Sequence, residues 1–320
     1  MLPPMTTYET AQLKYITLNS TPHAYIRFGR STGTPLFLHT HYRATLSHWD
    51  PALLNPLAAT RPILLLDSSG VGHSQGTIPT TFTQWAQIVL DFFAALSLTE
   101  VDVLGFSMGG CAAQMVALNA PRGLVRKLVL AGTMPSAGEG VVGAADLGPF
   151  LLIQEAETEE EQREGFLESF FGPSERSQGA GRESFERIRG ARKERGEYVG
   201  KEGAARQGEA YGNFMDTGRA GEGSYERLGE LTMPVLIANG EFEGLMWWKS
   251  TDERLLGDDD LLMPTVNSIV MYQKLQKANA QLHLYPDSGH GFLYQYAAQF
   301  AKLVNDFLDD ATLAPAADHE

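Results

Sequence analysis

A Gly-x-Ser-x-Gly turn constrains the fold of this chain more than any other feature of its sequence. Residues 105–109 read Gly-Phe-Ser-Met-Gly, and they separate a short apolar run from a helical pattern of small residues. So tight a strand-to-helix turn strains the serine backbone and leaves no room for side chains at Gly105 and Gly109. We therefore expect Ser107 to project from the carboxyl end of a strand, with the Met108 N–H able to bind a developing oxyanion. The alternative is that Ser107 is only a small packing residue.

The composition indicates a globular protein that acts on small molecules. The 320 residues are 43% hydrophobic and 20% charged, enough for one large domain with an insertion or for two ordinary domains. A formal net charge of −14 disfavours binding to nucleic acid and to anionic membranes. With Cys111 as the single cysteine, the sequence predicts neither an internal disulfide nor a cysteine-based zinc site.

Targeting and membrane signals are missing from the sequence. The first residues lack the basic start and apolar core of a secretory signal, and no apolar run reaches the ~18 residues of a membrane helix. We therefore expect a cytoplasmic protein that does not act at a membrane.

Continuous apolar strands alternate with helical patterns along the chain, which predicts an α/β fold with a mostly parallel, doubly wound sheet. The first two strands are expected to pair as a hairpin at the sheet edge. Predicted strands cover residues 13–19, 23–29, 35–39, 63–67, 101–104, 125–131, 234–239 and 281–285, and predicted helices cover 48–59, 81–98, 265–276 and 293–308.

The composition changes between residues 134 and 231, where Gly, Glu and Arg dominate. We interpret this region as a helical cap inserted into a core formed by residues 1–133 and 232–310, with a frayed tail at 311–320. A disordered charged linker is the alternative. Against it, the strand pattern resumes at residue 234 as though interrupted.

His290 is the best candidate for the base that activates Ser107, because a serine hydroxyl needs such a base to attack a carbonyl. It lies in a Gly-His-Gly loop directly after the last predicted strand. The other histidines lie in the tail, inside strands, on a helix or in earlier loops, and fit this role less well: His319, His23, His283, His48, His39, His41 and His73.

These motifs resemble the α/β-hydrolase superfamily and, more narrowly, cap-bearing fungal and bacterial hydrolases often labelled haloperoxidase-like. The resemblance implies the α/β-hydrolase fold, a serine triad in the order Ser-acid-His, and no metal or organic cofactor. It implies no particular substrate, since the superfamily includes esterases, lactonases, C–C hydrolases and ligand receptors. Besides residues 105–109, it rests on 41–43 (His-Tyr-Arg), 67–74 (Asp-Ser-Ser-Gly-Val-Gly-His-Ser), 239–240 (Asn-Gly), 264–268 (Pro-Thr-Val-Asn-Ser) and 285–291 (Tyr-Pro-Asp-Ser-Gly-His-Gly).

The resemblance also implies the groups around the serine. The backbone N–H groups of Arg43 and Met108 would form the oxyanion hole, and His41, Tyr42 and Phe106 would line the substrate pocket. For the Arg43 guanidinium two alternatives stay open, a contact with a substrate carbonyl or carboxylate and a surface salt bridge.

The triad acid is where the chain departs from the family pattern. The acid is expected three residues after a glycine and shortly before Pro-Thr. Counting from Gly257 leads to Asp260, which has the right spacing, whereas counting from Gly240 leads to Glu243. Removing residues 241–257 restores the pattern, so this segment is either a translated intron or a genuine insertion, and we favour Asp260 over Glu243.

These features predict a serine hydrolase for an ester, thioester, lactone or activated C–C bond of a neutral, moderately hydrophobic small molecule. Phe166, Phe170 and Phe171 of the cap either enclose that molecule or form the core of the cap itself. A rival hypothesis is a non-hydrolytic, receptor-like ligand-binding protein with an impaired triad.

Overall fold

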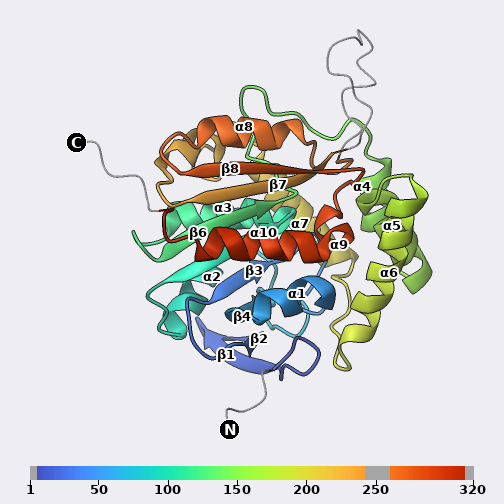
Figure 1. Cartoon of the computed structure of the whole chain (residues 1–320), viewed down its shortest axis with the longest axis horizontal. Helices are drawn as coiled ribbons and strands as arrows, with labels where there is room; N and C mark the ends of the chain where they lie inside the picture. The colour runs from blue at the N-terminus through green and yellow to red at the C-terminus, as the bar shows by residue number, and fades with distance from the viewer. Residues whose placement is uncertain (1–5, 242–259, 314–320) are drawn as a thin grey trace.

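An eight-stranded sheet runs through the computed structural model, which describes residues 6–241 and 260–313 (Figure 1). The spatial order is β1-β2-β4-β3-β5-β6-β7-β8. β1 and β2 form the predicted edge hairpin, β2 runs antiparallel to β4, and all the remaining neighbours are parallel. The strands are β1 (Lys14–Leu18), β2 (Thr21–Gly29), β3 (Leu36–His39), β4 (Pro62–Leu66), β5 (Val101–Phe106), β6 (Val125–Ala131), β7 (Val235–Glu241) and β8 (Ala280–Pro286).

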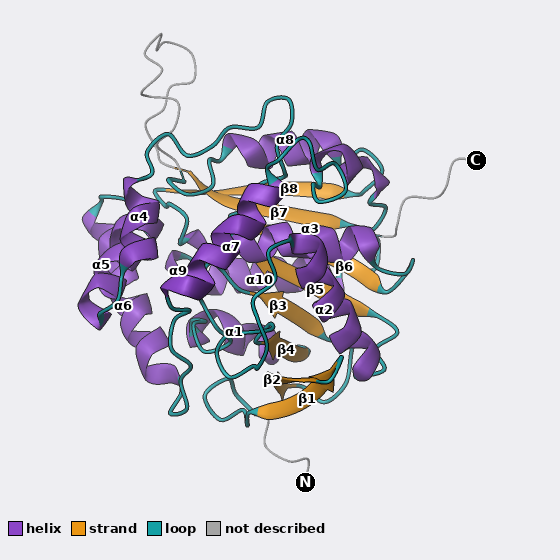
Figure 2. Cartoon of the chain, turned by 180° about the vertical axis from the view of Figure 1, so that it is seen from behind, coloured by secondary structure: helices purple, strands orange, loops and turns teal. Residues whose placement is uncertain are grey.

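Helices cover both faces of this sheet, which makes the fold doubly wound. α1 (Pro51–Ala58) and α10 (Ala297–Asp309) lie on the face shown in Figure 1, and α2 (Phe82–Ala95) and α3 (Met108–Asn119) lie on the other, shown in Figure 2. Alternate residues of β5 serve the two cores: Val103 packs among residues of α2 and α3, and Leu104 packs among residues of α1 and α10. Burial on both faces explains why the strands are continuously apolar.

Every predicted strand is present, but the last predicted helix is interrupted. Instead of one helix at 293–308, the chain forms α9 (Phe292–Gln295) and then α10. Tyr296 separates them, with φ −109° and ψ 35°. Its hydroxyl donates to the Pro286 carbonyl at 2.7 Å and its ring packs on Tyr285, so a contact with β8 sets the break.

Between β6 and β7 the chain forms mainly helices, at the side of the sheet where α4, α5 and α6 stand in Figure 1. We call residues 134–231 the helical segment. The disordered-linker alternative is therefore wrong, although the exact division into core and cap stays a prediction. The elements are α4 (Gly148–Glu155), α5 (Glu159–Phe170), α6 (Glu175–Ala191), α7 (Lys201–Phe214) and the 3₁₀ helix η1 (Tyr225–Glu230). After β7, α8 (Val266–Lys274) leads into β8.

Buried polar contacts fasten the helical segment to the rest of the chain. Asp50, fully buried at the start of α1, accepts hydrogen bonds from Arg187 and Ser184 of α6. Arg192 donates to the carbonyls of Tyr8 and Ala11 near the amino end. Both carboxylate oxygens of Asp50 are matched in this way, as burial requires, whereas Nε of Arg192 has no partner among the described residues.

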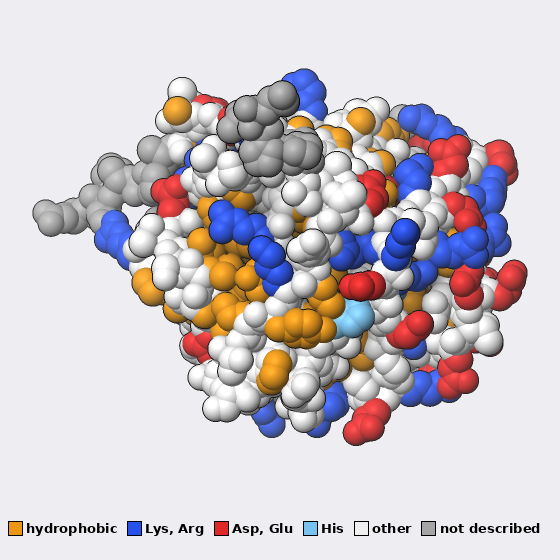
Figure 3. Space-filling view, turned by 90° about the horizontal axis from the view of Figure 1, so that it is seen from below, with side chains coloured by type: hydrophobic (Ala, Val, Ile, Leu, Met, Phe, Trp, Pro, Cys, Tyr) orange, Lys and Arg blue, Asp and Glu red, His pale blue; other side chains and the backbone are white. Residues whose placement is uncertain are grey.

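The surface carries charges of both signs. Figure 3 shows acidic and basic side chains interspersed over one part of the molecule and apolar side chains gathered over another. Among residues 6–241 and 260–313, no helix combines the length and apolar character needed to cross a membrane.

Candidate active site

The turn from β5 into α3 has the strained geometry that its sequence predicts. Ser107 has φ 58° and ψ −126°, a left-handed conformation that residues other than glycine rarely adopt. A Cβ at Gly105 would lie 2.4 Å from the Gly109 carbonyl oxygen, and a Cβ at Gly109 would lie 2.3 Å from that of His39. Only glycine permits these close approaches.

His290 and Asp260 form a fully buried pair. Nδ1 of His290 lies 2.7 Å from Oδ2 of Asp260, and both side chains are 0% exposed. Because a carboxylate can only accept, Nδ1 carries a proton, so in the neutral imidazole Nε2 is the nitrogen with the lone pair. Nε2 is buried and has no hydrogen-bond partner in the described part of the chain.

Neighbouring groups hold this pair in place. The other carboxylate oxygen of Asp260 accepts from the backbone N–H groups of Leu262 and Met263 at 2.9 and 2.8 Å. The His290 ring stacks on Phe106, the residue before Ser107, with 4.9 Å between ring centroids. The competing acid, Glu243, lies outside the described residues.

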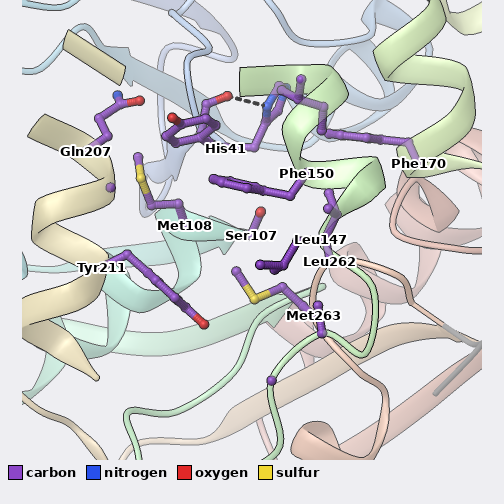
Figure 4. Close-up of a pocket in the computed structure, with 15 residues that line it drawn as sticks. His41, Ser107, Met108, Leu147, Phe150, Phe170, Gln207, Tyr211, Leu262 and Met263 are labelled. Carbon is purple, nitrogen blue, oxygen red and sulfur yellow. Dashed lines mark hydrogen bonds between the residues drawn. The ribbon is translucent and has the colours of Figure 1, made fainter. Parts of the chain in front are cut away.

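A cavity of about 290 Å³ contains Ser107 at its wall and is almost entirely apolar. Figure 4 shows the Ser107 hydroxyl among side chains of α4, α7 and the loop before α8. The lining residues are His41, Tyr42, Ser107, Met108, Gly143, Ala144, Leu147, Phe150, Ile153, Phe170, Gln207, Gly208, Tyr211, Leu262 and Met263.

His41 and Tyr42 line this cavity as the sequence predicts, but Phe106 does not. Phe106 is 0% exposed and packs beneath the site against Trp49 and Tyr294 as well as His290. The prediction for Phe106 is wrong because successive side chains of β5 point to opposite faces of the sheet. Phe106 lies on the face covered by α1 and α10.

Arg43 departs further from expectation. It is 4% exposed, its Nε donates to the Val199 carbonyl, and its Nη1 donates to the carbonyls of Ile153 and Gln154. Its guanidinium therefore binds backbone carbonyls, one of them that of Ile153 in the cavity wall, and forms no salt bridge with a described carboxylate. Its backbone N–H donates to Oε1 of Gln207 at 2.9 Å, so that N–H is not free to form an oxyanion hole.

The backbone N–H groups of Met108 and His41 have no acceptor among the described residues. Met108 is the first residue of α3, where N–H groups have no partner within the helix. His41 lies two residues before Arg43, whose N–H donates to Gln207. The backbone N–H of His41 itself has no hydrogen-bond partner in the same part of the chain. The Gly109 contact with His39 places this loop directly against the start of α3.

The His41 imidazole is neutral. Burial, and then the nearby His290, lower its pKa to about 3. Nδ1 donates to the Tyr42 carbonyl at 3.1 Å, as the dashed line in Figure 4 marks. His41 therefore adds no positive charge to the cavity at neutral pH.

Comparisons with known proteins agree with this architecture. Residues 36–296 match the family model described as alpha/beta hydrolase fold, well over half of the chain. The chain belongs to the alpha/beta hydrolase fold family.

Solved members of this fold superimpose over nearly the whole chain. An alpha/beta hydrolase fold protein from Chitinophaga pinensis is 29% identical, with a TM-score of 0.79 and coverage of 95% of this chain and 100% of that one. The enol-lactonase from Burkholderia xenovorans LB400 is 19% identical, with a TM-score of 0.70 and coverage of 93% and 100%. At that identity the second likeness shows the fold alone.

One curated relative matches over a shorter stretch. The dihydrolipoyllysine-residue acetyltransferase component of the acetoin cleaving system of Cupriavidus necator is 34% identical over 99 residues. These make up 31% of this chain and 26% of that protein, so the chain spans about a quarter of that relative.

Other singled-out residues of this alpha/beta hydrolase have structural roles. Asp102 is buried and pairs with Arg126. Asp67 accepts from the His73 N–H and so braces the loop after β4. Cys111 is buried, and burial raises the pKa of its thiol to about 11, which suits a packed core residue.

Sequence reasoning missed the contributions of α4, α7 and the loop after Asp260 to the cavity. Phe150, Gln207, Tyr211 and Met263 line it, yet each belongs to a segment without a motif. Their proximity to Ser107 follows from the way the helical segment packs. Among the described residues, no group of three or more His, Cys, Asp or Glu side chains could hold a metal ion.

Proposed function

We propose that this protein is a serine hydrolase that cleaves an ester, thioester, lactone or activated C–C bond of a neutral, moderately hydrophobic small molecule. The observation that carries the proposal is the buried His290–Asp260 pair, whose Nε2 lacks a protein partner, in a fold that places Ser107 on a strained elbow. A buried base with a free lone pair is what an elbow serine requires.

The reaction follows from these groups. Ser107 Oγ attacks the carbonyl carbon while His290 Nε2 takes its proton. As the tetrahedral intermediate collapses, the bond to the leaving group breaks and His290 returns the proton to that group. Water then attacks the acyl-enzyme by the same route. Asp260 keeps the proton on Nδ1 and stabilises the imidazolium that forms.

The oxyanion would be held by two backbone donors. We assign Met108 N–H, as the sequence suggested, and His41 N–H in place of Arg43 N–H. Support comes from the hydrogen bond that occupies the Arg43 group and from the absence of an acceptor for the other two within the described residues.

The cavity supports the substrate class. Its walls are mostly apolar, none of the described residues that line it is Asp, Glu, Lys or Arg, and about 290 Å³ suits a small molecule. Among p-nitrophenyl esters of graded length, we expect kcat/KM to peak at short to medium acyl chains. Activity that keeps rising on emulsified long-chain esters would contradict an enclosed site.

Replacing Ser107 by Ala tests the nucleophile. The variant should lose covalent labelling by a fluorophosphonate probe and lose kcat by roughly 10⁴-fold or more. Ser169→Ala is the control, because this buried serine of α5 does not line the cavity and bonds to the Pro149 carbonyl, so its loss should leave labelling intact. Unchanged turnover in the Ser107 variant would exclude the assignment.

The receptor-like alternative rested on displacement of Asp260 by residues 241–257. In this structure Asp260 bonds to His290, so that argument for an impaired triad no longer applies. A receptor would stay unlabelled by the probe yet gain thermal stability from its ligand.

A further inference from the structure

Gln207 places a fixed amide at the wall of an otherwise apolar cavity. It is 1% exposed, lies on α7 and lines the cavity together with Ser107 (Figure 4). Its bond to the Arg43 N–H identifies the bonded atom as the amide oxygen, since a backbone N–H can only donate. The amide nitrogen is thus the free end, and its hydrogens have no acceptor among the described residues.

The anchor for this amide is rigid. Arg43 uses its backbone and side chain together: its carbonyl accepts from the Val199 N–H at 2.8 Å, and its guanidinium donates to three carbonyls at 2.6–2.9 Å. No carboxylate among the described residues forms an ion pair with Arg43. The Gln207 amide oxygen is therefore bonded to a backbone segment that buried hydrogen bonds hold in place, which leaves the amide nitrogen as the donor for an acceptor on the ligand.

The other polar groups at the cavity wall are already engaged. The Tyr42 hydroxyl donates to the Ala204 carbonyl at 3.1 Å, and the Tyr211 hydroxyl donates to Sδ of Met134 at 3.3 Å. His41 donates through Nδ1 to the Tyr42 carbonyl. Apart from the reactive Ser107 hydroxyl, Gln207 is thus the described side chain of the wall with donors left for a ligand, and an apolar ligand would leave them unpaired at a cost.

We infer that Gln207 is a specificity-determining residue that selects substrates with a second acceptor oxygen, a keto or ether group, in addition to the scissile carbonyl. The inference rests on the proposed hydrolase function and narrows its substrate class to oxo- or alkoxy-substituted esters and lactones. A preorganised donor discriminates well because it loses little freedom on binding.

Matched pairs of esters test this inference. The p-nitrophenyl esters of 5-oxohexanoic and hexanoic acid, and of 4-oxopentanoic and pentanoic acid, differ within each pair by one carbonyl oxygen. With kcat/KM normalised to alkaline hydrolysis, the wild-type protein should prefer the oxo ester of at least one pair by about tenfold. Equal normalised rates in both pairs would overturn the inference.

Two variants remove the donor in different ways. Gln207→Glu keeps an acceptor for the Arg43 N–H, whereas Gln207→Met removes it, and neither presents an amide N–H to the ligand. Both should abolish the oxo preference. Tyr211→Phe, one turn along α7 at the same wall, is the matched control and should retain it. An oxo preference that survives in both Gln207 variants would assign it to another group and overturn the inference.

Binding to the Ser107→Ala protein separates this inference from the proposed function. Each uncleaved ester is titrated into that variant by calorimetry, with Gln207→Met added in the same background. If wild-type protein shows neither labelling nor turnover, the hydrolase proposal fails, and tighter binding of the oxo ester that Gln207→Met abolishes would still support the role of Gln207. If labelling and turnover are present but the oxo ester binds no better, the inference on Gln207 alone fails.

Discussion

At the scale of single residues, the site combines strain with tightly constrained hydrogen bonds. The positive φ of Ser107 persists because the glycines around it let β5, α3 and the loop after β3 approach within contact distance. His290 lies on a loop after β8, where its ring packs on Phe106 and its Nδ1 donates its one side-chain hydrogen bond within the described residues to Asp260. A substitution that changes one atom of the Asp260 carboxylate should therefore directly affect how His290 is held.

Asp260→Asn should lower kcat by about 10³- to 10⁴-fold, because an amide cannot hold the proton on Nδ1 or stabilise the imidazolium. Steady-state kinetics and a thermal melt check this together, since a collapse in stability would point to folding rather than chemistry. Glu243→Gln is the comparison. A large loss in Glu243→Gln with none in Asp260→Asn would transfer the role to Glu243.

At the scale of elements, the helical segment is joined to the rest of the chain by apolar packing and also by buried polar contacts. The Asp50 carboxylate caps α1 by accepting a hydrogen bond from the Ala52 N–H. It also accepts hydrogen bonds from Arg187 and Ser184 of α6. Such pairs specify how an insert docks, because a buried carboxylate without its partner is costly. These contacts fix the position of α6 against the start of α1.

Arg187→Gln should lower the free energy of unfolding by about 2 kcal/mol, because it removes the cation from a fully buried carboxylate. Arg189→Gln, two residues along α6, is the control: its partners Glu159 and Glu186 are exposed, and its loss should cost about 0.5 kcal/mol or less. Urea denaturation measures both. Equal effects would show that Asp50 does not anchor α6.

At the scale of the whole molecule, the fold buries several histidines in the neutral state. Burial lowers the pKa of His39 to about 4 and that of His41 to about 3, and it places the pKa of His48 well below 6.5. Asp67 acts in the opposite direction, because burial raises its pKa to about 6. These groups make stability depend on pH.

Stability should fall as the pH drops below 6.5. Below pH 6.5 the histidines of the unfolded chain bind protons, whereas the buried histidines of the folded protein do not until about pH 4. Each buried histidine with a lowered pKa therefore lowers the free energy of unfolding by about 2 kcal/mol at pH 5. Asp67 offsets part of this loss, since its folded form takes up a proton first. Urea denaturation at pH 7 and pH 5 measures the net effect.

His39→Gln should remove about 2 kcal/mol from the difference in unfolding free energy between pH 7 and pH 5. His283→Gln, on the exposed side of β8, is the matched control and should keep the wild-type dependence. The same dependence in both variants would exclude buried His39 as a cause.

The sequence by itself determined the parts of this protein that depend on local sterics and short periodicity. Apolar runs predicted the strands of a doubly wound sheet, and the spacing of Gly105, Ser107 and Gly109 predicted a strained elbow, because backbone contacts within a few residues decide both. The pattern after β8 likewise singled out His290 as the partner of Asp260 or Glu243.

Only the tertiary structure decided which distant groups meet. In the folded protein Asp260 bonds to His290, and Phe106 lies in the core. The Arg43 N–H donates to Gln207, a residue 164 positions away. No local pattern encodes such a contact, because it depends on how α7 docks over the carboxyl end of β5 after both have formed. The wall of the cavity, and therefore its selectivity, comes from packing between segments that are far apart in the chain.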